Sequence, residues 1–76
     1  MNPRVAAVAP LADYKLELKF LDGSVRVFDM TPYLEFGVFQ ELKDVSYFKL
    51  VTVKDGSIFW PNEQDLCPDT LFEESA

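Results

Sequence analysis

Histidine is absent from this sequence of 76 residues, and cysteine occurs once, as Cys67. The missing histidine removes the commonest general base and the commonest transition-metal ligand. A lone cysteine cannot form an internal disulfide, whereas small secreted domains usually depend on several. The N-terminal segment lacks the apolar core of a signal peptide, and no apolar run reaches the roughly 18 residues of a membrane span. These absences favour a soluble cytoplasmic protein with no cofactor, no metal site and no membrane partner.

Positive charge is also scarce. Seven Lys and Arg residues stand against thirteen Asp and Glu residues, which gives a formal net charge of −6. Such a surface repels a phosphate backbone, so direct nucleic-acid binding is not expected. The segment 63–76 holds five acids and no cation, with Glu73 and Glu74 among the acids. It either keeps a small domain soluble or steers the domain toward a basic protein partner.

Large apolar residues are abundant by contrast. Hydrophobic residues make up 49% of the chain, which includes seven Phe, three Tyr and one Trp. The length predicts a single domain over residues 1–76, and a domain this small buries only roughly 60–65% of the surface that its unfolded chain exposes. Some apolar side chains are therefore expected on an interface with a protein partner or in a homodimer. The alternative is scattered exposure without function.

The clearest structural signal is a β-hairpin over residues 14–29. Apolar and charged residues alternate before the pair Asp22-Gly23, and this is the pattern of a half-buried strand followed by a two-residue turn. A two-residue turn places Phe20 opposite Val25 on the core face. The same register sends Phe28 to the solvent face of the sheet.

A second hairpin is predicted over residues 51–60, with Asp55-Gly56 as its turn. In this register Val53 pairs with Ile58, and Phe59 reaches the outer face. The two outward rings, Phe28 and Phe59, either form part of a contact patch or lie beneath a helix or loop of the same chain.

Short helical segments are expected around the hairpins. Thr31 and Pro32 are typical of a helix start, and Pro68 opens a second helix at the C-terminal end. A weaker strand over residues 4–9 precedes the first hairpin. The predicted fold class is α+β, with one small, mostly antiparallel sheet of about five strands built from two hairpins. Short helices lie between the hairpins and at the C-terminus.

The segment IFWPNEQDLCPDTLF, residues 58–72, contains the single Trp and the single Cys of the chain together with two Pro residues. Alternation directs Trp60 inward, with an indole N–H that needs a partner. Asp65 is predicted to stabilise the following loop by accepting backbone N–H groups. Cys67 is expected to be a small buried or capping residue, and Pro68 begins the helix. All four are interpreted as structural anchors.

No catalytic residue is predicted, because a nucleophile needs an adjacent base or a lowered pKa. The acids around Cys67 disfavour its thiolate, although the start of a helix favours it. The alternative function is a small acid-dependent hydrolase or a ligand-binding domain that uses the loop carboxylates of Glu63 and Asp65.

A series of motifs runs from Pro3 to Phe72: P-x-V, D-Y-x-L-x-L-x-F-x-D-G, G-V-F-Q-E-L-K-D, F-K-L-V, I-F-W-P-N and D-L-C-P-D-T-L-F. In this order and spacing they resemble the bacterial family known as domain of unknown function 2442. The resemblance implies a small α+β fold with no established activity and no catalytic residues. Many members have Gly where this chain has Glu63, so either Asn62 supplies a left-handed turn residue or the loop is shaped differently.

The resemblance also bears on partners. Genes of this family often lie beside those of another small uncharacterised family, which implies a toxin–antitoxin-like pair. Some longer relatives carry a C-terminal helix-turn-helix domain, which is not expected within these residues. The predicted function is therefore a non-catalytic protein-interaction module, the antitoxin-like or regulatory partner of a small basic protein encoded beside it. The candidate partner-binding residues are Phe28, Phe59, Glu73 and Glu74.

Overall fold

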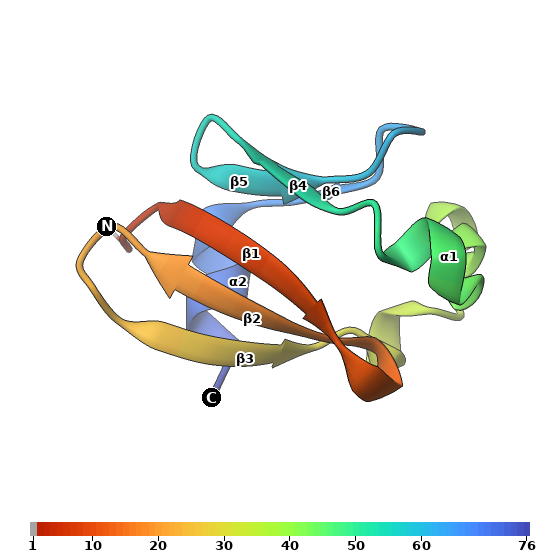
Figure 1. Cartoon of the computed structure of the whole chain (residues 1–76), viewed down its shortest axis with the longest axis horizontal. Coiled ribbons are helices and arrows are strands. Elements are labelled where there is room, and N and C mark those ends of the chain that lie inside the picture. The colour runs from red at the N-terminus through yellow and green to blue at the C-terminus, as the bar shows by residue number, and fades with distance from the viewer. Residues whose placement is uncertain (1) are drawn as a thin grey trace.

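The computed structural model describes residues 2–76, which form two three-stranded antiparallel sheets and several short helices (Figure 1). The first sheet has the strand order β1-β2-β3 and the second the order β4-β5-β6. The strands are β1 (Val5–Leu11), β2 (Lys15–Phe20), β3 (Val25–Asp29), β4 (Thr52–Lys54), β5 (Ser57–Phe59) and β6 (Asp65–Leu66). The α+β class is confirmed, whereas the prediction of one sheet of about five strands is wrong.

Short helical turns connect these strands. They are η1 (Ala12–Tyr14), η2 (Thr31–Tyr33), η3 (Gly37–Lys43), α1 (Val45–Phe48) and α2 (Pro68–Glu73). Figure 1 shows η3 and α1 at one end of the molecule and α2 crossing one face of the first sheet. The ring of Phe72 on α2 lies edge-on to Phe20 of β2, with centroids 5.1 Å apart. One hydrophobic core therefore unites the helix with the first sheet.

The first hairpin differs by one residue from the sequence prediction. The N–H of Phe20 donates to the carbonyl of Ser24 at 2.9 Å, so three residues rather than two form the loop. Gly23 supplies the positive φ, +91°, that the third position of such a loop requires. The carboxylate of Asp22 accepts the N–H of Ser24 at 2.9 Å, and hydrogen bonds from Ser24 lower the pKa of Asp22. The loop thus supplies its own stabilising contacts.

This shift exchanges the two faces of β3, because successive side chains of a strand point to opposite sides. Phe28 is paired with Leu16 and is only 1% exposed, whereas Val25 is 57% exposed. The Phe28 ring instead packs against Tyr33, with centroids 5.5 Å apart. The prediction that Phe28 lies on the solvent face is therefore wrong.

The second hairpin has the predicted register, with Val53 opposite Ile58. Asp55 and Gly56 both have positive φ, 53° and 80°, as a two-residue turn of this type requires. β1 lies beside β4 and β5 and is bonded to the turn between them: the N–H of Val5 donates to the carbonyl of Gly56 at 2.9 Å. The two sheets therefore pack side by side without merging into one ladder.

Gly56 also allows a close approach that no other residue permits. A Cβ atom at this position would lie 2.7 Å from both Cβ and Cδ of Arg4. We expect Gly56→Ala to lower the free energy of unfolding by roughly 2–4 kcal/mol, since backbone strain and overpacking add. Gly23→Ala is the matched control, because φ is also positive there but nothing lies within 4 Å of the added Cβ. Urea unfolding that gives equal losses for both variants would contradict the close contact.

Candidate functional site

The predicted partner-binding residues do not form a single patch. Phe59 on β5 is half-buried, and Glu73 and Glu74 are exposed at the end of α2. Figure 1 shows β5 and the C-terminal end of α2 well apart. Each region instead lines a pocket of its own.

The first region is the Phe59 pocket, an open hollow of about 400 Å³. Asp65 is the cross-strand neighbour of Phe59, and the ammonium of Lys54 lies 5.9 Å from the centre of the Phe59 ring. Glu63 completes the acidic rim. The full lining is Lys54, Asp55, Ser57, Ile58, Phe59, Glu63 and Asp65. The two loop carboxylates of the alternative hypothesis thus share one pocket with a predicted contact aromatic.

Gln64, rather than Asp65, holds the loop after Trp60. Its side chain is 3% exposed; Nε2 donates to the carbonyl of Val38 at 3.0 Å and to Glu41 at 2.9 Å. The hydroxyl of Tyr47 donates to Oε1 at 2.7 Å. This network fastens the loop to η3 and α1. Sequence reasoning missed Gln64, because glutamine is mostly an exposed residue and its partners are distant in the chain.

Glu63 itself supplies the left-handed conformation of this loop. Its φ is +71°, and its N–H donates to the carbonyl of Trp60 at 2.9 Å. This is the position where many relatives are expected to carry Gly. Asn62 has another function, since its N–H donates to the Tyr47 hydroxyl at 2.7 Å.

Cys67 occupies the N-cap position of α2, and Pro68 follows in the first turn, as predicted. The thiol is exposed, so the prediction of burial is wrong. The Thr70 hydroxyl, 3.1 Å from Sγ, lowers the pKa of Cys67, while the negative charge of Asp69 acts in the opposite direction.

The second region is the Phe36 pocket, a hollow of about 400 Å³ between β3, η2 and the end of α2. Phe36 is 62% exposed at its rim, and the buried Phe28 is one of its lining residues. The lining consists of Phe28, Asp29, Pro32, Tyr33, Phe36 and Glu74. Two predicted contact residues, Phe28 and Glu74, therefore line the same pocket, although Phe28 contributes from the core.

Glu74 and Tyr33 are joined across this pocket. The Tyr33 hydroxyl donates to Oε1 of Glu74 at 2.6 Å, and this bond raises the pKa of Tyr33 to about 12. The bond fixes the orientation of both side chains. It links the C-terminal end of α2 to the segment after β3.

This bond predicts a late tyrosine titration. In the spectroscopic titration of phenolate absorbance, Tyr33 should ionise near pH 12, and Glu74→Gln should move its pKa down toward 10. A raised folded-state pKa stabilises the fold fully below the unfolded value, so this contribution is lost as pH rises from about 10 through about 12. Tyr33→Phe should remove the late transition. A late transition that persists in Tyr33→Phe would assign it to another tyrosine.

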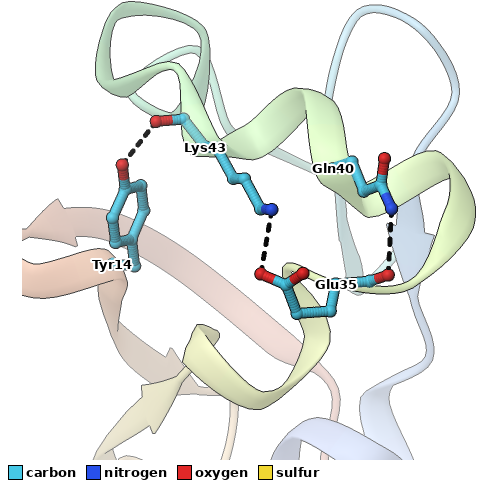
Figure 2. Close-up of polar contacts among 4 residues, drawn as sticks. All are labelled: Tyr14, Glu35, Gln40 and Lys43. Atoms are coloured by element: carbon cyan, nitrogen blue, oxygen red, sulfur yellow. Dashed lines mark hydrogen bonds and ion pairs between the residues drawn. The ribbon is translucent and has the colours of Figure 1, made fainter.

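Polar contacts fasten the segment that carries Phe36 (Figure 2). Lys43 forms an ion pair with Glu35 at 2.8 Å, and the side-chain amide of Gln40 donates to the Glu35 carbonyl at 3.1 Å. The hydroxyl of Tyr14 donates to the Lys43 carbonyl, which connects the segment to the first sheet. An exposed ion pair contributes little stability, but these contacts hold the backbone next to Phe36 in one position.

A third hollow, of about 540 Å³, lies beside the turn between β1 and β2. Asp13 and Tyr14 both have φ near +60°, which is costly for residues other than glycine. Tyr14 compensates through its hydroxyl bond to Lys43 and through its carbonyl, which accepts the N–H of Met30 at 2.9 Å. This strain is thus explained by attachment of the helical segment to the first sheet.

The negative charges of the surface are largely uncompensated. Within residues 2–76, the pair Lys43–Glu35 is the one salt bridge within 4.0 Å. Other cations are engaged elsewhere: Arg4 donates to the carbonyl of Asp55 at 2.7 Å, and the guanidinium of Arg26 lies 3.8 Å from the centre of the Phe72 ring. Most carboxylates of the described residues therefore form no internal ion pair.

These features define a small acidic α+β domain with shallow pockets where aromatic rings meet carboxylates. The chain belongs to the family described as Protein of unknown function (DUF2442), which matches residues 5–76. The resemblance inferred from the motifs is thereby confirmed. No curated protein and no solved structure matches the chain significantly.

No helix within residues 2–76 is both long and apolar enough to cross a membrane. No group of three or more Cys, Asp or Glu side chains in the same range is arranged to hold a metal ion.

Proposed function

We propose that this domain is a non-catalytic protein-interaction module of the cytoplasm that binds a small basic protein. The observation that carries the proposal is that the exposed Phe36 ring and Glu74 line one pocket, on a surface with few internal ion pairs. Exposed aromatic residues are common energetic anchors of interfaces. Uncompensated negative charge accelerates encounter with a basic surface.

The contact surface differs from the one expected from the sequence. Phe28 is buried and contributes only as a wall of the Phe36 pocket. The proposed aromatic anchor is instead Phe36, which is exposed. The half-buried Phe59, together with Glu63 and Asp65, is proposed as a second contact. Glu73, which accepts a hydrogen bond from Asn2 at 2.9 Å, contributes long-range attraction.

The particular partner proposed is a protein encoded beside this one, with this chain as the antitoxin-like or regulatory member of the pair. This choice rests on the gene arrangement that the family resemblance implies. A homodimer is the competing arrangement, and sedimentation of the purified chain distinguishes the two.

Binding kinetics with the purified neighbouring gene product test the proposal. The association rate should fall about tenfold or more when salt is raised from about 50 to about 500 mM, because screening weakens steering. Glu73→Gln should slow association at low salt and leave the dissociation rate unchanged. A self-associating chain, or the absence of any complex with the neighbouring product, would contradict the proposed pairing.

The alternative, a ligand-binding or hydrolytic domain, is favoured by one observation: Glu63 and Asp65 share the Phe59 pocket. It predicts that a small molecule binds there and is lost in the double variant Glu63→Gln, Asp65→Asn. A screen of small fragments by NMR, with this variant as the control, decides for or against it.

A further inference from the structure

We propose that the Phe36 pocket receives an arginine side chain of the basic partner. This inference rests on the proposed function and names its central contact. The pocket joins aromatic walls to a carboxylate, which is the combination that a guanidinium group recognises.

The walls suit a flat, partly apolar group. Phe28 and Tyr33 lie at an interplanar angle of 30° with centroids 5.5 Å apart, and Phe36 stands 62% exposed at the rim. A volume of about 400 Å³ is near the lower end of the roughly 300–1,000 Å³ typical of ligand pockets. The pocket is therefore large enough to admit one side chain.

Glu74 is the carboxylate available to the incoming charge. Its Oε1 accepts the Tyr33 hydroxyl, which orients the group, and Oε2 is left for a second donor. Asp29 is less available, because its Oδ1 accepts both the N–H and the hydroxyl of Thr31. Lys15 is also the cross-strand neighbour of Asp29, and its charge opposes a second cation there.

Arginine rather than lysine fits this arrangement. The guanidinium group is planar, stacks on aromatic rings and is less strongly hydrated than an ammonium group. The chain shows the same mode internally, since Arg26 lies 3.8 Å from the Phe72 ring centre while donating to the Phe72 carbonyl at 3.0 Å. The Phe36 pocket offers a comparable ring with a carboxylate in place of the carbonyl.

The experiment is an NMR titration of the full chain with acetyl-arginine amide. Acetyl-citrulline amide, which has the same shape without charge, and acetyl-lysine amide serve as comparison probes. The pocket variants are Phe36→Ala and Glu74→Gln. The matched controls are Val38→Ala, which truncates a 68% exposed side chain of the same segment, and Glu17→Gln, which removes one negative charge from the exposed face of β2, away from the pocket.

We expect the arginine probe to shift the resonances of the residues that line the pocket, and to bind at least about fivefold more tightly than either comparison probe. Each pocket variant should weaken binding about tenfold, and each control less than about twofold. Equal affinity for all three probes, shifts centred on the Phe59 pocket, or no shifts at all would overturn the inference. A salt-sensitive complex with the neighbouring gene product would still support the proposed function in those cases.

Discussion

Replacing Trp60 with alanine should unfold the domain. The side chain is 0% exposed, and truncating a buried aromatic residue costs about 3–5 kcal/mol. The indole N–H donates to the Phe48 carbonyl at 2.9 Å, so the variant also leaves a buried acceptor without its donor. A domain of this size has a net stability of only about 3–5 kcal/mol.

Circular dichroism during thermal unfolding measures this effect. Trp60→Phe is the matched control, because it retains most of the packing and loses only the indole hydrogen bond. We expect a cooperative but lower melting temperature for Trp60→Phe and no cooperative transition for Trp60→Ala. A thermal unfolding transition of Trp60→Ala close to that of the wild type would show that Trp60 is not a core residue.

Phe28→Ala is expected to have an effect of similar size on stability. Phe28 is 1% exposed, so its truncation should also cost about 3–5 kcal/mol. Phe36→Ala, by contrast, removes an aromatic side chain that is 62% exposed and should change the free energy of unfolding by less than about 1 kcal/mol. The two variants therefore separate a core ring from a surface ring within one pocket.

A comparison of Phe28→Ala with a variant of the neighbouring residue tests the register of the first hairpin. Urea unfolding of Phe28→Ala and Val27→Ala compares neighbouring positions on opposite faces of β3. The observed register predicts the larger loss at Phe28, because Val27 is 37% exposed. A larger loss of unfolding free energy in Val27→Ala would instead indicate the register with a two-residue turn, in which Val27 faces the core.

The two hairpins show how far local sequence specifies a strand pairing. Asp55-Gly56 forms the two-residue turn that its sequence indicates, since both residues take positive φ. Asp22-Gly23 has the same letters, yet Leu21 joins its loop and only Gly23 has a positive φ. The dipeptide is compatible with both loop lengths, and the strand VRVFD has apolar residues on both faces. Neither signal could decide the register.

The candidate site was less accessible to sequence reasoning than the fold. Phe36 and Glu74 are separated along the chain, and they line one pocket only because α2 crosses the first sheet and the Glu74 side chain reaches the Tyr33 hydroxyl of η2. The contacts of Glu35 with Lys43 and Gln40 likewise form only because η3 folds back toward Glu35. The surplus of acidic residues is evident from the composition. The position of Glu74 in the Phe36 pocket is not, because it depends on the tertiary structure.

Recognition of a basic protein through the Phe36 pocket is tested most directly by one equilibrium measurement. The affinity of the purified neighbouring gene product is measured by calorimetry for the wild type, for the double variant Phe36→Ala, Glu74→Gln and for the control double variant Val38→Ala, Glu17→Gln. We predict binding to the wild type, a loss of at least about thirtyfold in the pocket variant, and a loss of less than about fivefold in the control. Equal affinity of the two double variants, or no binding to the wild type, would contradict it.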